Sequence, residues 1–133
     1  MGLATPLAVQ LGRALGGGMG QGLVCGAVSG SLLILGLGPG RNDDESRARA
    51  ETVEMAREFS HRFVNDHGSI ICKELLGVDV GTEDGHRQAV ARGLFESACP
   101  RFVAKAAALL EMMLAGSAVD QSSAPEPRAD VVA

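Results

Sequence analysis

Three cysteines, Cys25, Cys72 and Cys99, are the residues of this 133-residue chain best suited to redox chemistry or metal binding. Their number is odd and none forms a Cys-x-x-Cys pair, so the sequence encodes neither a secreted disulfide framework nor a zinc ribbon. Cys99 precedes Pro100 and Cys72 precedes Lys73, which places both near expected helix N-termini, where the helix dipole lowers a thiol pKa. A second interpretation stays open, in which the cysteines are only small buried apolar side chains.

Other residue types offer weaker chemistry. The three histidines lack the spacing of a zinc pair, and the acidic residues fall mainly on expected solvent-facing helix surfaces. The glycine run at 16–22 contains no Gly-x-Gly-x-x-Gly and is not followed by Gly-Lys-Ser/Thr. We therefore expect a structural turn there, and no bound nucleotide.

The composition excludes some classes of partner. The chain has 12 basic and 16 acidic residues and four Phe but no Trp or Tyr, so it has neither the basic patch nor the stacking platform of a nucleic-acid-binding protein. Residues 14–40 carry no charge, but their dense apolar part, 23–37, is shorter than the roughly 20 residues of a membrane span. No basic segment precedes it, as a signal peptide requires. We expect a buried helix and a cytoplasmic protein.

The periodicity predicts an all-α fold, a compact bundle of about five helices with a glycine-rich central helix. The expected helices span 7–15, 23–37, 43–66 and 82–95 and begin again at Pro100, with a short helical turn within 69–76. Glycines 22, 26 and 30 recur every four residues and predict close approach of another backbone. Residues 1–116 are expected to form one helical domain. Residues 117–133, which show no period, are expected to form a disordered tail.

The segment Cys25-Gly26-Ala27-Val28-Ser29-Gly30 resembles the signature of the C-GCAxxG-C-C family of redox-active proteins. Its hallmark Cys-Gly-Ala-x-x-Gly is matched by Cys25, Gly26, Ala27 and Gly30. Later single cysteines match as well, Cys72 within Cys-Lys-Glu-Leu-Leu-Gly and Cys99 within Cys-Pro. The resemblance covers roughly residues 10–114.

This resemblance implies a helical fold and a redox function beside oxidoreductase or transport systems. It makes Cys25, Cys72 and Cys99 the candidate redox and metal-ligating residues, with Gly26 and Gly30 beside a cofactor such as an iron–sulfur cluster. The family's upstream fourth cysteine has no counterpart here, whereas clusters usually take four thiolates and a disulfide needs only two. Covalent haem is not expected, because the chain has no Cys-x-x-Cys-His.

Three hypotheses follow from these patterns. The first is a redox protein that uses clustered cysteines, through thiol chemistry or an iron–sulfur cluster, together with a redox partner protein. The second is a non-catalytic helical binding module, and the third is a membrane-associated component that uses the glycine face. The resemblance also implies an upstream helix that is missing here, which would leave exposed Leu7, Leu11 and Leu15 and part of the surface of 32–37. We therefore expect a homodimer or other association through residues 3–37, or else a truncated product that aggregates.

Overall fold

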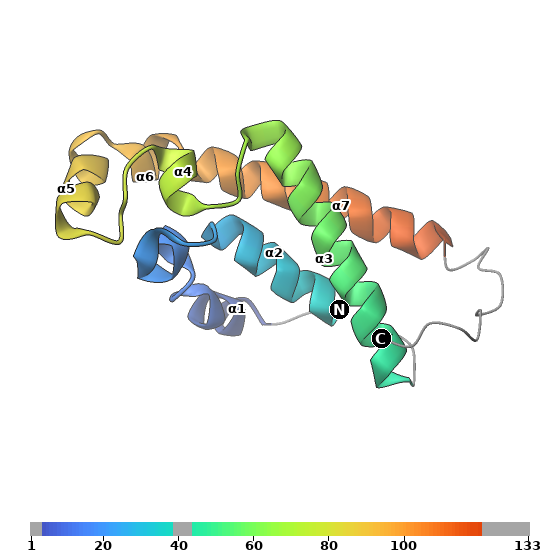
Figure 1. Cartoon of the computed structure of the whole chain (residues 1–133). Helices are drawn as coiled ribbons and strands as arrows, with labels where there is room; N and C mark the ends of the chain where they lie inside the picture. The colour runs from blue at the N-terminus through green and yellow to red at the C-terminus, as the bar shows by residue number, and fades with distance from the viewer. Residues whose placement is uncertain (1–3, 39–43, 121–133) are drawn as a thin grey trace.

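The computed structural model describes residues 4–38 and 44–120, and over these residues the fold is all-α, as predicted (Figure 1). These described residues form seven α-helices and one glycine turn. They are α1 (Thr5–Gly12), the turn η1 (Gly18–Gly22), α2 (Gly26–Leu37), α3 (Glu45–His67), α4 (Cys72–Leu76), α5 (Glu83–Ala91), α6 (Leu94–Ser97) and α7 (Cys99–Asp120). Within these residues we find no helix with the length and hydropathy that a membrane span requires.

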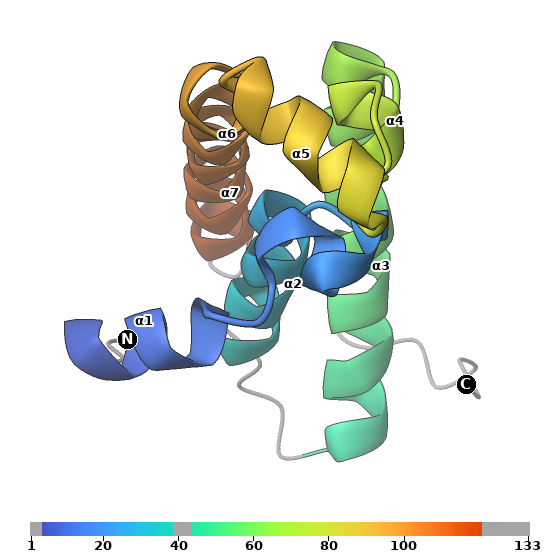
Figure 2. The ribbon, with the colours of Figure 1, turned by 90° about the vertical axis from the view of Figure 1, so that its left-hand side faces the viewer.

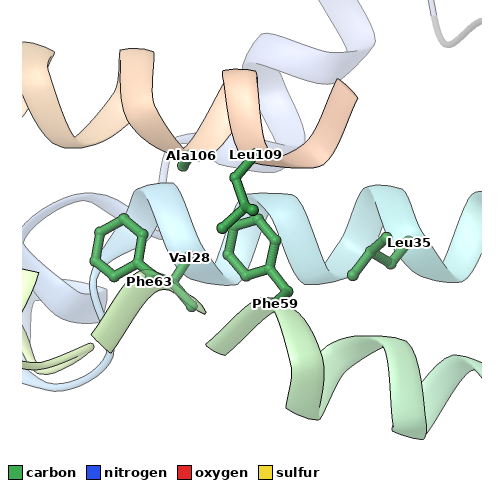
Figure 3. Packing of buried hydrophobic residues seen from close by; sticks show 6 residues of the cluster. All are labelled: Val28, Leu35, Phe59, Phe63, Ala106 and Leu109. Carbon is green, nitrogen blue, oxygen red and sulfur yellow. The ribbon is translucent and has the colours of Figure 1, made fainter. Parts of the chain in front are cut away.

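The core of the bundle lies where α2 packs against both α3 and α7, so the glycine-rich helix is central, as expected. Figure 3 shows the six buried side chains that meet there, two from each helix. They are Val28, Leu35, Phe59, Phe63, Ala106 and Leu109. Phe59 and Phe63 lie one helical turn apart on α3, and both are fully buried. The buried part of this long helix is therefore a narrow apolar stripe.

A second, smaller core joins α4, α5, α6 and the start of α7. Its buried members are Cys72, Leu76, Val80, Ala89 and Ala98. Phe102 of α7 packs against both cores and links them. Two of the three cysteines, Cys72 and Cys99, therefore belong to this second core.

Several helix ends differ from the predicted ones. The helix expected over 82–95 is two helices, because Gly93 adopts a left-handed backbone (φ 62°) between α5 and α6. On α5, Ala89 is buried, whereas the neighbouring Val90 is 56% exposed. Two helices begin with a side-chain cap: Asp44 caps α3 and Thr82 caps α5.

The C-terminal helix is longer than predicted. α7 continues to Asp120, so residues 117–120, expected at the start of the disordered tail, extend the helix instead. Adding a residue to an existing helix is much easier than nucleating one, so a weak sequence can continue it. The remainder of the expected tail, residues 121–133, lies outside the described residues.

His67 ends α3 in an apolar environment. Its ring centroid lies 4.5 Å from that of Phe63 and 5.2 Å from that of Phe102. Its Nε2 atom is buried and has no hydrogen-bond partner among the described residues.

Candidate redox site

Cys25 and Cys72 are joined by a short backbone pairing. The N–H of Cys25 donates to the carbonyl of Ile70 (2.8 Å), and the N–H of Cys72 donates to the carbonyl of Leu23 (2.6 Å). These bonds enclose the antiparallel bridge between Val24 and Ile71. Since side chains alternate between the two faces of such a pairing, both cysteines lie on the face opposite Val24 and Ile71. They are diagonal neighbours, a relationship that typically separates Cα atoms by about 7–8 Å.

This pairing also corrects two predictions about the glycine-rich segment. The helix expected over 23–37 begins only at Gly26, because residues 23–25 are extended to pair with residues 70–72. Gly22 therefore lies outside the helix, with φ 67°, and is not part of a helical glycine ladder with Gly26 and Gly30.

All three cysteines stand at the beginning of a helix. Cys25 is the N-cap of α2, Cys72 is the first residue of α4 and Cys99 is the first residue of α7. Figure 1 shows that these three helices begin at the same end of the bundle. All three thiols are free, Cys72 is buried, and Cys25 and Cys99 are half-buried.

The glycine turn η1 covers Cys72. A Cβ atom at Gly18 would lie 2.9 Å from the Cβ of Cys72 and still closer to the backbone of Leu23. Only glycine fits there, because real Cβ contacts are not that short and because Gly18 has φ 61°. With this cover the exposed fraction of Cys72 falls to 6%.

A second loop holds the turn in place. The Oδ1 atom of Asp79 accepts a hydrogen bond from the N–H of Gly81 (2.9 Å), and a Cβ at Gly22 would lie 2.7 Å from the same oxygen. A Cβ at Gly81 would lie 2.6 Å from the carbonyl oxygen of Gln21. The turn and the loop therefore pack backbone against backbone, and sequence analysis missed Asp79 and Gly81 as parts of the site.

The electrostatics differ from the prediction. Burial, together with the smaller effect of negative charge on Cys25, Cys99 and Asp79, raises the pKa of the Cys72 thiol from 9.0 to about 11. Burial also raises the pKa of Cys99, with smaller contributions from charge on Cys25 and Glu96. The expectation that helix N-termini lower these two pKa values is wrong, because desolvation and repulsion outweigh the dipole. Since charge on Cys25 affects both Cys72 and Cys99, and charge on Cys99 affects Cys72, the three thiols share one electrostatic environment.

Gly26 and Gly30, expected beside a cofactor, both face Leu15. A Cβ at Gly26 would lie 2.6 Å from the Leu15 carbonyl oxygen, whereas a Cβ at Gly30 would lie 4.0 Å from the Leu15 Cδ1 atom. The close backbone approach predicted for this helix is therefore confirmed at Gly26. Chain packing alone requires a glycine there.

The residues do not fit an iron–sulfur cluster in the arrangement that the structure gives them. Across residues 4–38 and 44–120, no three His, Cys, Asp or Glu side chains are placed to hold a metal ion together. The donor set is also short, with three thiols where a cluster usually takes four. We therefore derive no chemical step from a cluster.

Comparison with known proteins places the chain in a family. The family model described as "Putative redox-active protein (C_GCAxxG_C_C)" matches residues 1–113. The chain belongs to this family. A search of curated proteins and a search of solved structures found no match. Membership in the C_GCAxxG_C_C family supports a redox role for the protein in general terms.

Proposed function

We propose that this C_GCAxxG_C_C protein performs thiol–disulfide exchange, with Cys25 and Cys72 as the exchanging pair. The observation that carries the proposal is the bridge that puts both cysteines on one face at diagonal positions. A separation of about 7–8 Å between Cα atoms slightly exceeds the 4.4–6.8 Å of a disulfide, so a small backbone shift closes the bond.

In the first step, the Cys25 thiolate attacks one sulfur of a disulfide in the partner molecule. The partner's S–S bond breaks, a mixed disulfide with Cys25 forms, and the departing sulfur takes up a proton. Cys25 is assigned to this step because its side chain is half-buried, whereas Cys72 is only 6% exposed.

In the second step, Cys72 loses its proton and attacks the Cys25 sulfur. The Cys25–Cys72 disulfide forms, and the partner's second sulfur leaves as a thiol. The partner has gained two electrons and two protons, and the protein has lost the same number. A neutral mixed disulfide at Cys25 no longer repels a Cys72 thiolate, so the first step removes one cause of the raised Cys72 pKa.

Cys99 is a third, half-buried thiol in the same electrostatic environment, and it takes part in neither step. The exchange partner is a protein or small molecule with an accessible disulfide, consistent with a redox partner protein in an oxidoreductase or transport system. Iron–sulfur chemistry at the same cysteines is the competing function, and the test below separates the two.

The test uses protein purified without oxygen and analysed for iron, sulfide and free thiols. It is then treated with glutathione disulfide and examined by mass spectrometry. We expect no stoichiometric iron or sulfide, and a Cys25–Cys72 disulfide that leaves one of the three cysteines free. Cys72→Ser should retain a glutathione adduct on Cys25, since no second thiol at position 72 displaces it.

The matched control is Cys99→Ser, which should still form the intramolecular disulfide. Stoichiometric iron and sulfide would overturn the thiol mechanism in favour of a cluster. Three free thiols after treatment would overturn exchange altogether, and a disulfide that includes Cys99 would overturn the choice of pair.

A further inference from the structure

Helix α1 has no packing partner among residues 4–38 and 44–120. None of its residues is buried, and the exposed fractions of Leu7, Val9 and Leu11 are 44%, 57% and 56%. Figure 2 shows α1 standing away from the bundle of α2, α3 and α7. The helix is apolar on more than one side, since Leu7 and Leu11 lie on one face and Val9 lies on another.

A helix of eight residues is too short to be stable in water on its own. Most helices in proteins gain their stability by burying an apolar face against another element. Because the described residues cover none of α1, its stabilising contact lies outside the part of the chain that the structure describes.

A second uncovered surface lies on α2 beside α1. Gly26, Gly30, Leu33 and Leu37 follow one another along one face of this helix. Leu15, just beyond α1, covers the first two positions, but the exposed fractions of Leu33 and Leu37 are 56% and 50%. Within the described part of the chain, one half of this apolar stripe is therefore covered and the other half is open.

The charge distribution decides between the possible occupants. Arg13 is the only charged residue in 4–38. Helices that lie on a membrane surface carry a face rich in Lys and Arg, and α1 contains neither. Two identical charge-free surfaces can meet without burying an unpaired charge, and the centres of protein interfaces are likewise depleted in charge.

We propose that α1 and the Leu33/Leu37 face of α2 form the interface between two copies of this chain, with α1 of each copy lying on α2 of the other. This isologous arrangement encloses α1 on more than one side and completes the half-covered stripe. It does not depend on the thiol chemistry, because neither α1 nor the Leu33/Leu37 face contains a cysteine.

The test measures molar mass by light scattering over a micromolar concentration series. Wild-type protein should have the mass of a dimer. Leu11→Glu and Leu33→Glu should each weaken dimerisation about tenfold or more, since each places two like charges in an apolar interface. The matched control is Val103→Glu on α7, whose exposed fraction of 55% is close to the 56% of Leu11 and Leu33.

Leu11→Glu separates loss of dimerisation from loss of folding, because Leu11 lies on the uncovered α1 and does not contact the core. Circular dichroism verifies that the variant is folded. A wild-type monomer throughout the series overturns the proposal, as does a dimer that Leu11→Glu and Leu33→Glu leave intact. Flotation of the wild-type monomer with neutral phosphatidylcholine vesicles would identify a lipid surface as the occupant instead.

Discussion

The carbonyl oxygen of Leu15 lies where a side chain at Gly26 would begin, 2.6 Å from the position of a Cβ atom. The chain between α1 and the glycine turn thus rests directly on the first turn of α2, next to Cys25. This contact ties the start of the signature helix to the backbone that leads into the cover of Cys72.

Gly26→Ala should lower the free energy of unfolding by about 1–3 kcal/mol, because the new methyl group forces two backbones apart. The control is Gly36→Ala on the same helix, where a Cβ meets nothing within 4 Å. That variant should gain up to about 1 kcal/mol from helix propensity. Urea denaturation measures both. Equal midpoints for Gly26→Ala and the parent would show that the contact is loose.

The raised pKa of Cys72 predicts a loss of stability at alkaline pH. Below pH 9 the thiol is protonated in both the folded and the unfolded chain and has no effect on the pH dependence. Between pH 9 and about 11 the unfolded thiol ionises while the folded thiol keeps its proton, so the free energy of unfolding falls as pH rises. The difference between wild type and Cys72→Ala in urea denaturation should shrink over this range. A difference independent of pH would contradict the raised pKa.

Met19 has a strained backbone. It is the one non-glycine residue with positive φ (59°) among the described residues, and glycines 17, 18 and 20 flank it with similar values. A left-handed conformation costs an L-residue about 1–2 kcal/mol, so Met19→Gly should preserve or raise stability, whereas the β-branched Met19→Val should lower it. Thermal unfolding of both variants is the measurement. A stable Met19→Val protein would mean that the turn relaxes readily.

His67→Phe should raise the free energy of unfolding by about 1 kcal/mol or more. The substitution keeps an aromatic ring between Phe63 and Phe102 and removes the buried Nε2 atom that has no partner in the described part of the chain. His67→Ala, which removes the ring as well, should lower stability through lost packing. If His67→Phe is instead less stable in urea, then Nε2 has a favourable interaction that the isolated chain does not reveal.

The sequence predicted most of the fold because its signals are local. Pro100 lies in the first turn of α7 as predicted, α4 falls within the predicted 69–76, and α3 and α5 begin within two residues of the predicted 43 and 82, since such signals act within one helical turn. The left-handed Gly93 was missed because a single glycine in a helical pattern does not reveal the sign of its φ angle.

The sequence predicted which cysteines form the candidate site, but not what surrounds them in the fold. The cysteines could be chosen from their type and from the family signature, whereas the raised pKa of Cys72 depends on burial under Gly18 and on Asp79, 61 positions further along. Helix-end arguments predicted lowered pKa values because they consider only the dipole of the residue's own helix. The pairing of residues 23–25 with 70–72 is a long-range contact that no local pattern encodes.

The glycine cover over Cys72 also has a kinetic consequence. Because the buried thiol can react with an outside molecule only after the turn moves, its rate of modification measures an opening equilibrium rather than the frequency of encounters with an oxidant. A Cys72 modified by an external reagent therefore records that the turn has opened in that molecule. The buried cysteine acts as a built-in reporter of local unfolding at the point where three helices begin.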